Sequence, residues 1–170
     1  MKLKIREIAI FAMLGAVMFV SKLVMEGLPN IHLLGTFTIA FTLTYRKKAI
    51  FPICAYLFAN GIWEGFNLFG WLPETYIWFI LWGVVMLLPK NIPNRVAPVI
   101  YMMISALHGL LFDVLYAPAY MLFAGYEWHD LGTILLLGLP FSIFQAVGNF
   151  VLGILIVPIS TLLCKLDKKT

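Results

Sequence analysis

Long apolar runs separated by short polar or basic segments dominate the hydrophobic pattern of this chain. A helix needs about 20 mostly apolar residues to cross a bilayer, and the alternation typical of membrane-spanning strands is absent. We therefore predict an all-α polytopic membrane protein, built as a single domain over residues 1–170. The six predicted transmembrane helices cover about residues 7–26, 32–45, 49–69, 73–88, 96–117 and 140–163, and residues 118–139 are interpreted as an outer loop that acts as a lid or is half-inserted.

Composition supports the membrane class. Apolar residues make up 62% of the chain and charged residues 12%, against about 45–50% and about 25% in soluble domains. The mean hydropathy is +0.96. The first apolar run follows basic residues, as in a signal peptide, but it is too long and no A-x-A cleavage site follows it. We therefore interpret it as the first spanning helix.

The basic residues predict the orientation. Of the 12 lysines and arginines, all but Lys22 fall at one set of helix ends, which the positive-inside rule makes cytoplasmic. Both termini are then cytoplasmic, in a multi-pass protein of the cell membrane, and the net charge of +4 reports topology, not nucleic-acid binding. The basic residues at these ends are Lys2, Lys4, Arg6, Arg46, Lys47, Lys48, Lys90, Arg95, Lys165, Lys168 and Lys169, and the acidic residues expected on the other side are Glu26, Glu74, Glu127 and Asp130.

Lys22 lies near the opposite end of the first helix. We expect its side chain to extend to the outer headgroups, as lysine stems often do. The alternative is an ion pair with Glu64 or Asp113 inside a cavity.

Several polar residues converge on the outer half of the membrane. Counting about 1.5 Å per residue from the cytoplasmic helix ends puts Glu64 and Asp113 there, and an ionisable group inside a membrane indicates function. Gln145 and Asn149 form a polar stripe at helical spacing on the last helix. A polar and aromatic pocket open to the outside is typical of small-molecule sites. The predicted substrate-binding residues are His32, Trp63, Glu64, Asn67, Asp113, Tyr126, Trp128, Gln145 and Asn149.

A purely structural interpretation stays open for some of these groups. Asp113, Gln145 and Asn149 could instead hydrogen-bond one another and hold helices together. His108 lies nearer the middle of the membrane, and we interpret it as a core histidine, since one imidazole needs only one partner.

Small residues line one side of the first helix, at Ala9, Ala12, Gly15 and Ala16. Such a stripe lets another helix backbone approach closely. The neighbouring helix belongs either to the same bundle or to a partner subunit.

Motifs for catalysis or metal binding are missing. The sequence has no G-x-x-x-x-G-K-[ST] loop for ATP hydrolysis and no G-x-S-x-G element, and its three histidines have no metal-ligand spacing. We expect no catalytic residue, no metal and no cofactor. Two other classes remain open: a small ion-coupled transporter or channel that uses Lys22, Glu64 and Asp113, and a membrane enzyme with His108 and Asp113 as acid and base.

The chain resembles the substrate-binding S component of the energy-coupling factor (ECF) vitamin transporters. The resemblance rests on the length of 170 residues, the six predicted helices, the inner termini and the segment Ala12-Met-Leu-Gly-Ala16, which matches the A-x-x-x-A motif of that family. In that family the motif contacts the coupling helices of a membrane partner, and two cytoplasmic ATPases supply the energy.

This resemblance implies a non-enzymatic transport subunit that binds a vitamin from the outside and topples in the membrane to release it inside. The implied partners are a transmembrane coupling subunit, two ATPases and the lipid bilayer, with no nucleic acid. The segments IHLLGTFTIAFTLTYRKKA and NGIWEGFNL are most similar to the S components assigned to cobalamin, which makes cobalamin the expected vitamin. No residue here is matched to a corrin contact.

Overall fold

The computed structural model describes residues 3–28, 30–89 and 92–168. These residues form helices and the turns between them, with no strand in the described ranges, so the all-α prediction is confirmed. Of the basic residues counted for topology, Lys2, Lys90 and Lys169 lie outside the described residues. The α-helices are α1 (Ile5–Val24), α2 (Leu34–Tyr45), α3 (Ile50–Glu64), α4 (Trp71–Leu87), α5 (Ala97–Leu110), α6 (Phe112–Phe123), α7 (Leu131–Leu152) and α8 (Ile156–Lys168), and the short 3-10 helices are η1 (Arg46–Ala49), η2 (Trp128–Asp130) and η3 (Gly153–Leu155).

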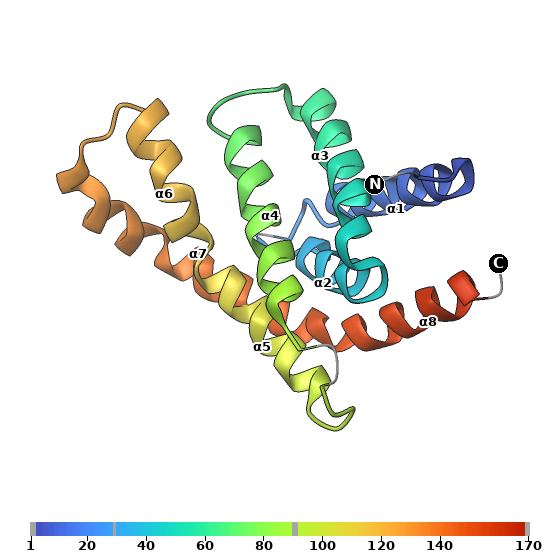
Figure 1. The fold of residues 1–170 in the computed structure, drawn as a ribbon. Helices are drawn as coiled ribbons and strands as arrows, with labels where there is room; N and C mark the ends of the chain where they lie inside the picture. Colours follow the sequence, from blue (N-terminus) through green and yellow to red (C-terminus); the bar gives the residue numbers. More distant parts are fainter. Residues whose placement is uncertain (1–2, 29, 90–91, 169–170) are drawn as a thin grey trace.

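In the described part of the chain, three helical segments are long and apolar enough to cross a membrane. They are Ile5–Val24, Ala97–Phe123 and Trp128–Asp167, and α4 is a shorter apolar helix. The last segment has 40 residues, twice the length of about 20 that a crossing requires. It changes direction at η3, so that α7 and α8 meet at an angle (Figure 1).

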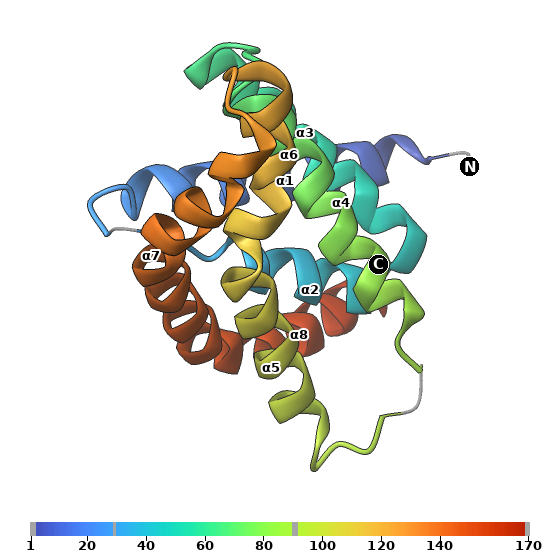
Figure 2. The ribbon, with the colours of Figure 1, turned by 90° about the vertical axis from the view of Figure 1, so that its left-hand side faces the viewer.

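Helix α2 is the centre of the fold. All its residues from 34 to 42 are buried, as expected for a helix that is hydrophobic all round. Figure 2 shows it in the middle of the molecule, among α4, α5, α7 and α8, and it packs on all four. Two of its threonines are satisfied locally: the Thr42 hydroxyl donates to the Thr38 carbonyl at 2.6 Å and that of Thr44 to the Ala40 carbonyl at 2.9 Å. The hydroxyls of Thr36 and Thr38 are buried without a hydrogen-bond partner among the described residues. With 12 residues, α2 rises only about 18 Å, too short to cross a bilayer alone.

Two close helix crossings depend on glycine. Gly15 of α1 lies against α3, where an added Cβ would come within 2.5 Å of the Ala55 Cβ and 2.9 Å of the Pro52 carbonyl oxygen. Gly109 of α5 lies against α7, where a Cβ would meet the Asn149 amide nitrogen at 2.8 Å. These crossings hold α1 to α3 and α5 to α7, the two most extensively packed helix pairs.

The predicted boundaries in the first half of the chain differ from the structure by a few residues. The largest difference is at α3, which ends at Glu64 and not near residue 69. Gly65 follows with a φ of +82°, a conformation that favours glycine and ends helices. The Asn67 side chain then accepts the backbone N–H groups of Phe69 and Gly70, at 3.1 and 2.5 Å, and so organises the turn into α4.

The prediction of a long outer loop over residues 118–139 is wrong. The predicted fifth helix is interrupted at Leu111, not at Pro118, and α6 continues through Pro118 to Phe123. Helix α7 begins at Leu131, with Pro140 inside it. Long apolar helices tolerate proline, because the freed backbone groups are satisfied by local adjustment. Only residues 124–130 remain as the α6–α7 connection.

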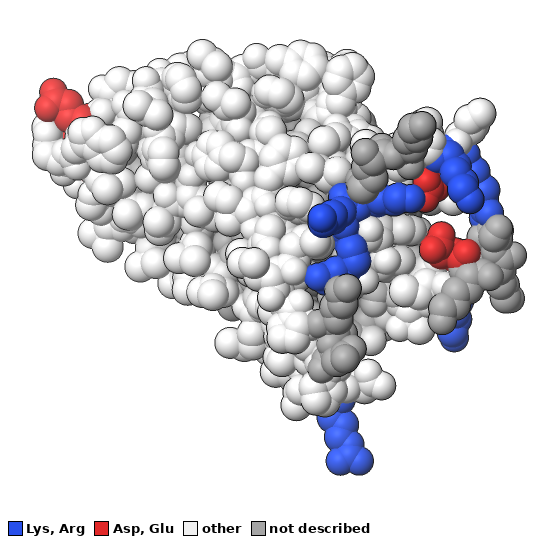
Figure 3. Space-filling view, viewed as in Figure 1, with Lys and Arg blue, Asp and Glu red and all other residues white. Residues whose placement is uncertain are grey.

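Charged side chains are distributed unevenly over the surface. On the face shown in Figure 3, lysine and arginine side chains gather toward the right and below, over the end of α8 and the start of α5, with acidic side chains among them at the right. The visible left-hand end, over the α6–α7 connection, carries acidic and no basic side chains. Lysine and arginine are therefore concentrated at one end of this face, as the loop residues of the sequence predict.

Candidate functional site

Two adjoining cavities lie between the helices. The lysine cavity, of about 270 Å³, is lined by Lys22 of α1, by the α1–α2 connection with His32, and by Glu74 of α4. The tyrosine cavity, of about 540 Å³, is lined by α6, by the α6–α7 connection with Tyr126, and by α7. Both cavities share the lining residues Asn30, Phe112, Tyr116 and Gln145.

Lys22 joins three helices on one wall of the lysine cavity. Its ammonium lies 2.5 Å from a carboxylate oxygen of Glu64 at the end of α3 and 3.4 Å from one of Glu74 on α4. It also donates to the Asn60 amide oxygen at 2.9 Å. The expected extension of Lys22 to the headgroups is therefore wrong, and the alternative ion pair with Glu64 is confirmed.

Asn60 and Tyr56 complete this cluster, which we call the Lys22 cluster (Lys22, Tyr56, Asn60, Glu64, Glu74). The Asn60 amide nitrogen donates to Glu64 at 3.2 Å and to Glu74 at 2.9 Å, and the Tyr56 hydroxyl donates to Glu74 at 3.1 Å. The Glu74 side chain is 15% exposed and that of Glu64 35%. Two carboxylates thus share one ammonium, and the more enclosed carboxylate receives more hydrogen bonds.

A stripe of aromatic rings runs from one cavity into the other. Phe112, Tyr116 and Tyr120 lie four residues apart on one face of α6. Consecutive ring centroids are 5.8 and 5.2 Å apart, and Tyr126 of the connection continues the series at 6.2 Å from Tyr120. The Tyr116 hydroxyl donates to the Gly70 carbonyl at 3.0 Å, which ties this stripe to the start of α4.

Asp113 lies at the wall of the tyrosine cavity, where α6 meets α7. Its carboxylate accepts the Ser142 hydroxyl at 2.6 Å. Gly138 of α7 leaves room for it, since a Cβ there would come within 2.5 Å of the same oxygen. The described residues include no lysine, arginine or histidine within ion-pair distance of this carboxylate.

Gln145 is buried between the two cavities. Its residue surface is only 3% exposed, and it lines both cavities. No described residue forms a hydrogen bond with its side-chain amide. The His32 ring packs edge-on against Trp78 with centroids 5.7 Å apart, and its Nδ1 is enclosed without a hydrogen-bond partner among the described residues. The Gln145 amide, which is not among the fully enclosed atoms, is therefore the polar group available to a molecule in the cavities.

The structure gathers only part of the predicted site. Four predicted residues, His32, Asp113, Tyr126 and Gln145, line the two cavities. The other five lie elsewhere: Glu64 belongs to the Lys22 cluster, Asn67 caps the α3–α4 turn, Trp63 packs against Phe19, Trp128 is 70% exposed, and Asn149 donates to the Ser105 carbonyl at 3.2 Å.

Other lining residues were not predicted to bind substrate, and the polar or aromatic ones among them include Glu74, Phe112, Tyr116 and Tyr120. The spacing of four residues between the three α6 rings could have predicted them, because it places them on one helix face. No sequence pattern indicates Glu74, since its partners Lys22 and Asn60 are 52 and 14 residues away in the chain.

His108 is a core residue, as predicted. It is buried, with its Nε2 3.3 Å from the Ile77 carbonyl oxygen and its ring 5.3 Å from that of Trp78. Asp113 bonds to Ser142 instead. The two residues considered as an acid–base pair therefore have separate partners.

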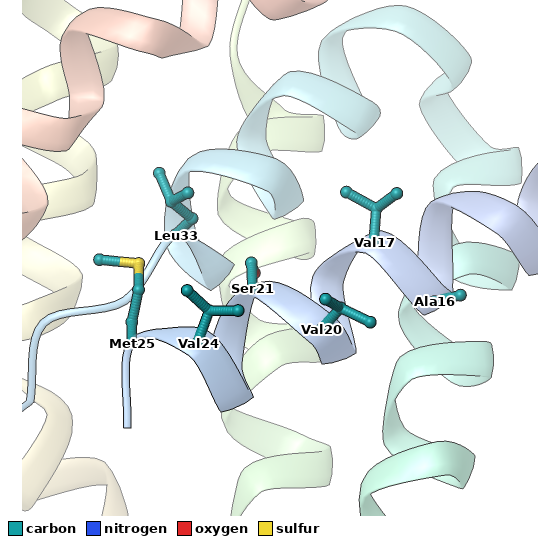
Figure 4. Close-up of a pocket in the computed structure, with 7 residues that line it drawn as sticks. All are labelled: Ala16, Val17, Val20, Ser21, Val24, Met25 and Leu33. Carbon is teal, nitrogen blue, oxygen red and sulfur yellow. The ribbon is translucent and has the colours of Figure 1, made fainter. Parts of the chain in front are cut away.

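The small-residue stripe of α1 divides between two roles. Gly15 is buried against α3, so its predicted place in a docking surface is wrong. Ala9, Ala12 and Ala16 are exposed. Beside them, α1 and Leu33 form an apolar groove of about 550 Å³ (Figure 4), lined by Ala16, Val17, Val20, Ser21, Val24, Met25 and Leu33.

The described ranges hold no group of three histidine, cysteine, aspartate or glutamate side chains that could bind a metal ion. Comparisons with protein-family models, with curated proteins and with solved structures find no match for this chain.

Proposed function

We propose that this chain is the substrate-binding subunit of an ECF-type, ATP-driven vitamin importer in the cell membrane. It captures a vitamin from the outer side and delivers it together with a transmembrane coupling subunit and two cytoplasmic ATPases. The observation that supports this proposal most is the pair of adjoining cavities, which combine aromatic rings with an unpartnered amide and a carboxylate among the described residues. Such a mixture is typical of small-molecule sites.

The proposed topology has six crossings and both termini in the cytoplasm. The crossings are α1, α2, α3, α4, the pair α5 and α6, and the pair α7 and α8. Because α2 has only 12 residues, its crossing requires local thinning of the bilayer. The gathering of basic side chains over the end of α8 and the start of α5 supports it (Figure 3). The tyrosine cavity, with Tyr126 of the α6–α7 connection in its lining, then opens to the outside.

The size of the cavities bears on the choice of vitamin. Their volumes of about 270 and 540 Å³ compare with about 300–1,000 Å³ for typical ligand pockets. Cobalamin, the vitamin favoured by the sequence resemblance, is larger than either cavity. Its binding would require the α6–α7 connection to move outward, whereas a smaller vitamin needs no such movement.

The exposed alanines of α1 support a docking surface for the coupling subunit. Ala12 and Ala16 lie one helical turn apart and leave a shallow apolar face, of the kind that lets two helices approach closely in a membrane.

Replacing Ala12 by leucine tests this role. We expect the purified Ala12→Leu chain to keep its thermal midpoint and its ligand affinity, and to lose uptake when coexpressed with a coupling subunit and ATPases. Ala124→Leu adds the same bulk at the end of α6 and should leave uptake intact. Normal uptake by Ala12→Leu would contradict the docking role, and joint loss of fold and binding would show that Ala12 is only packing.

The Lys22 cluster favours a second candidate, a small ion-coupled transporter or channel. An ammonium shared by Glu64 and Glu74 can serve as a relay of protons. Asp113 is bonded to Ser142 and not to this cluster. Solute uptake by the chain alone in proteoliposomes, driven by a proton gradient, would establish this alternative, and we expect none.

A further inference from the structure

The lining of the tyrosine cavity carries an uncompensated negative charge. Asp113 is its one charged lining residue among those described, and the carboxylate is held by a hydroxyl, not by a cation. The nearest ammonium on the adjoining cavity, that of Lys22, already contacts Glu64, Glu74 and Asn60. The electrostatic field in the cavity therefore favours a positively charged molecule.

Aromatic rings surround the same space. Phe112, Tyr116 and Tyr120 form a continuous stripe along it, and Tyr126 continues the stripe from the connection. The faces of such rings attract ammonium and alkylated-nitrogen cations, and the attraction grows when the cation leaves water. A carboxylate beside several tyrosines is therefore a suitable environment for an organic cation.

Gln145 gives an independent reason to expect a ligand there. Its residue surface is only 3% exposed, and it lines the cavity without a hydrogen-bond partner among the described residues. Its amide atoms are not among the fully enclosed polar atoms that lack a partner, so they face the cavity, where a polar group of a ligand can hydrogen-bond to them. The ligand should thus carry a polar group as well as its charge.

We propose that the tyrosine cavity binds a small organic cation, with its charge near Asp113, its body against Tyr116 and Tyr120, and a hydrogen-bonding group at Gln145. This inference rests on the proposed function, because it names the class of solute that the importer would capture. The volume of about 540 Å³ suits a molecule of one or two rings.

A series of ligands that differ in charge tests this proposal. The purified full chain would be titrated calorimetrically with 1-methylnicotinamide, nicotinamide and nicotinate, which share one ring and carry a positive, zero and negative charge. Thiamine and choline serve as further cations. We expect saturable binding of at least one cation, and at least tenfold weaker binding of nicotinamide and nicotinate. Equal or tighter binding of the neutral or anionic probe, or no binding of any cation, would overturn the proposal.

Asp113→Asn removes the charge, keeps the shape, and leaves an oxygen for the Ser142 hydroxyl. We expect it to weaken cation binding at least tenfold. Glu127→Gln, which changes an exposed acid of the α6–α7 connection, should leave cation binding unchanged. Thermal midpoints and circular dichroism would show that both variants fold. Unchanged cation affinity in a folded Asp113→Asn chain would contradict the site.

The two proposals fail in different ways. Tight binding of a neutral vitamin that is insensitive to Asp113→Asn would leave the importer role standing and refute the cation site. Cation binding without uptake in the presence of the coupling subunit and the ATPases would support the cation site and refute the importer role.

Discussion

At the scale of single residues, the Lys22 cluster shows how charges are accommodated in an apolar bundle. Each carboxylate of the cluster accepts from both Lys22 and Asn60, and Glu74 accepts from Tyr56 as well. A partly buried charge is stable only when such partners replace water. Lys22 is the shared partner, so its removal affects three helices at once.

We therefore expect Lys22→Met to lower the free energy of unfolding by about 1–2 kcal/mol, less than for a fully buried pair because the cluster is partly exposed. Glu64→Gln should cost less, since the Glu64 side chain is the more exposed of the two carboxylates. Thermal unfolding in detergent measures both. The double variant Lys22→Met with Glu74→Gln should recover part of the loss, and an additive loss would argue against the shared charge.

For the candidate site, the sequence predicts the depth of a residue along its helix, but not the direction in which its side chain points. Counting along helices put His32, Asp113 and Gln145 at one level, and all three line the cavities. The same count put Asn149 there, but its side chain points between α5 and α7 to Ser105. Depth follows from helical rise, whereas the direction of a side chain depends on which helices pack on which face.

At the scale of helices, the crossing of α5 and α7 supports the cavity wall. Gly109 brings α5 against the backbone of α7, where an added Cβ would lie 3.1 Å from the Gln145 carbonyl carbon and 3.1 Å from the Ala146 nitrogen. The position of Gln145 on α7, and with it that of its side-chain amide, therefore depends on Gly109 of α5.

Gly109→Ala should push α5 and α7 apart, with a loss of about 1–3 kcal/mol in the free energy of unfolding, as is typical of overpacked cores. It should also weaken ligand binding, because Gln145 moves. Gly83→Ala on α4 is the matched control: a Cβ there has no neighbour within 4 Å, and alanine favours a helix over glycine. Thermal unfolding and calorimetric titration would reveal the difference, and equal behaviour of the two variants would contradict the close crossing.

Prolines explain where the helix predictions failed in the second half of the chain. The bounds of α1 and α4 are predicted to within about two residues. Pro118 and Pro140 mark helix ends in the sequence-based prediction, but both lie inside helices. In soluble helices an interior proline is disruptive, whereas apolar helices of membrane proteins often accommodate one. The break that does occur, at Leu111, had no marker in the sequence.

At the scale of the whole molecule, the uneven charge distribution makes the orientation testable. The α6–α7 connection and the end of α8 should lie on opposite sides of the membrane. Trp128 in the connection and Cys164 near the end of α8 are both exposed in the structure, so each offers a position for chemical labelling.

In intact spheroplasts, a membrane-impermeant maleimide should label a cysteine placed by Trp128→Cys, in a chain that also carries Cys54→Ser and Cys164→Ser. Cys164, kept as the single cysteine, should react only after permeabilisation. The reverse pattern, or labelling of both positions from outside, would contradict the proposed topology.

The proposed function depends on the claim that the chain binds a vitamin without its partners. A fluorescence titration of the purified chain tests this claim directly. The buried Trp78 ring lies 5.7 Å from His32 and 6.4 Å from Phe112, which line the cavities. The purified, folded chain would be titrated with a panel of vitamins that includes cobalamin, with correction for ligand absorbance. We expect one vitamin to give a tight, saturable change that Gln145→Leu weakens. No saturable change with any vitamin would contradict a substrate-binding subunit that captures its ligand without its partners.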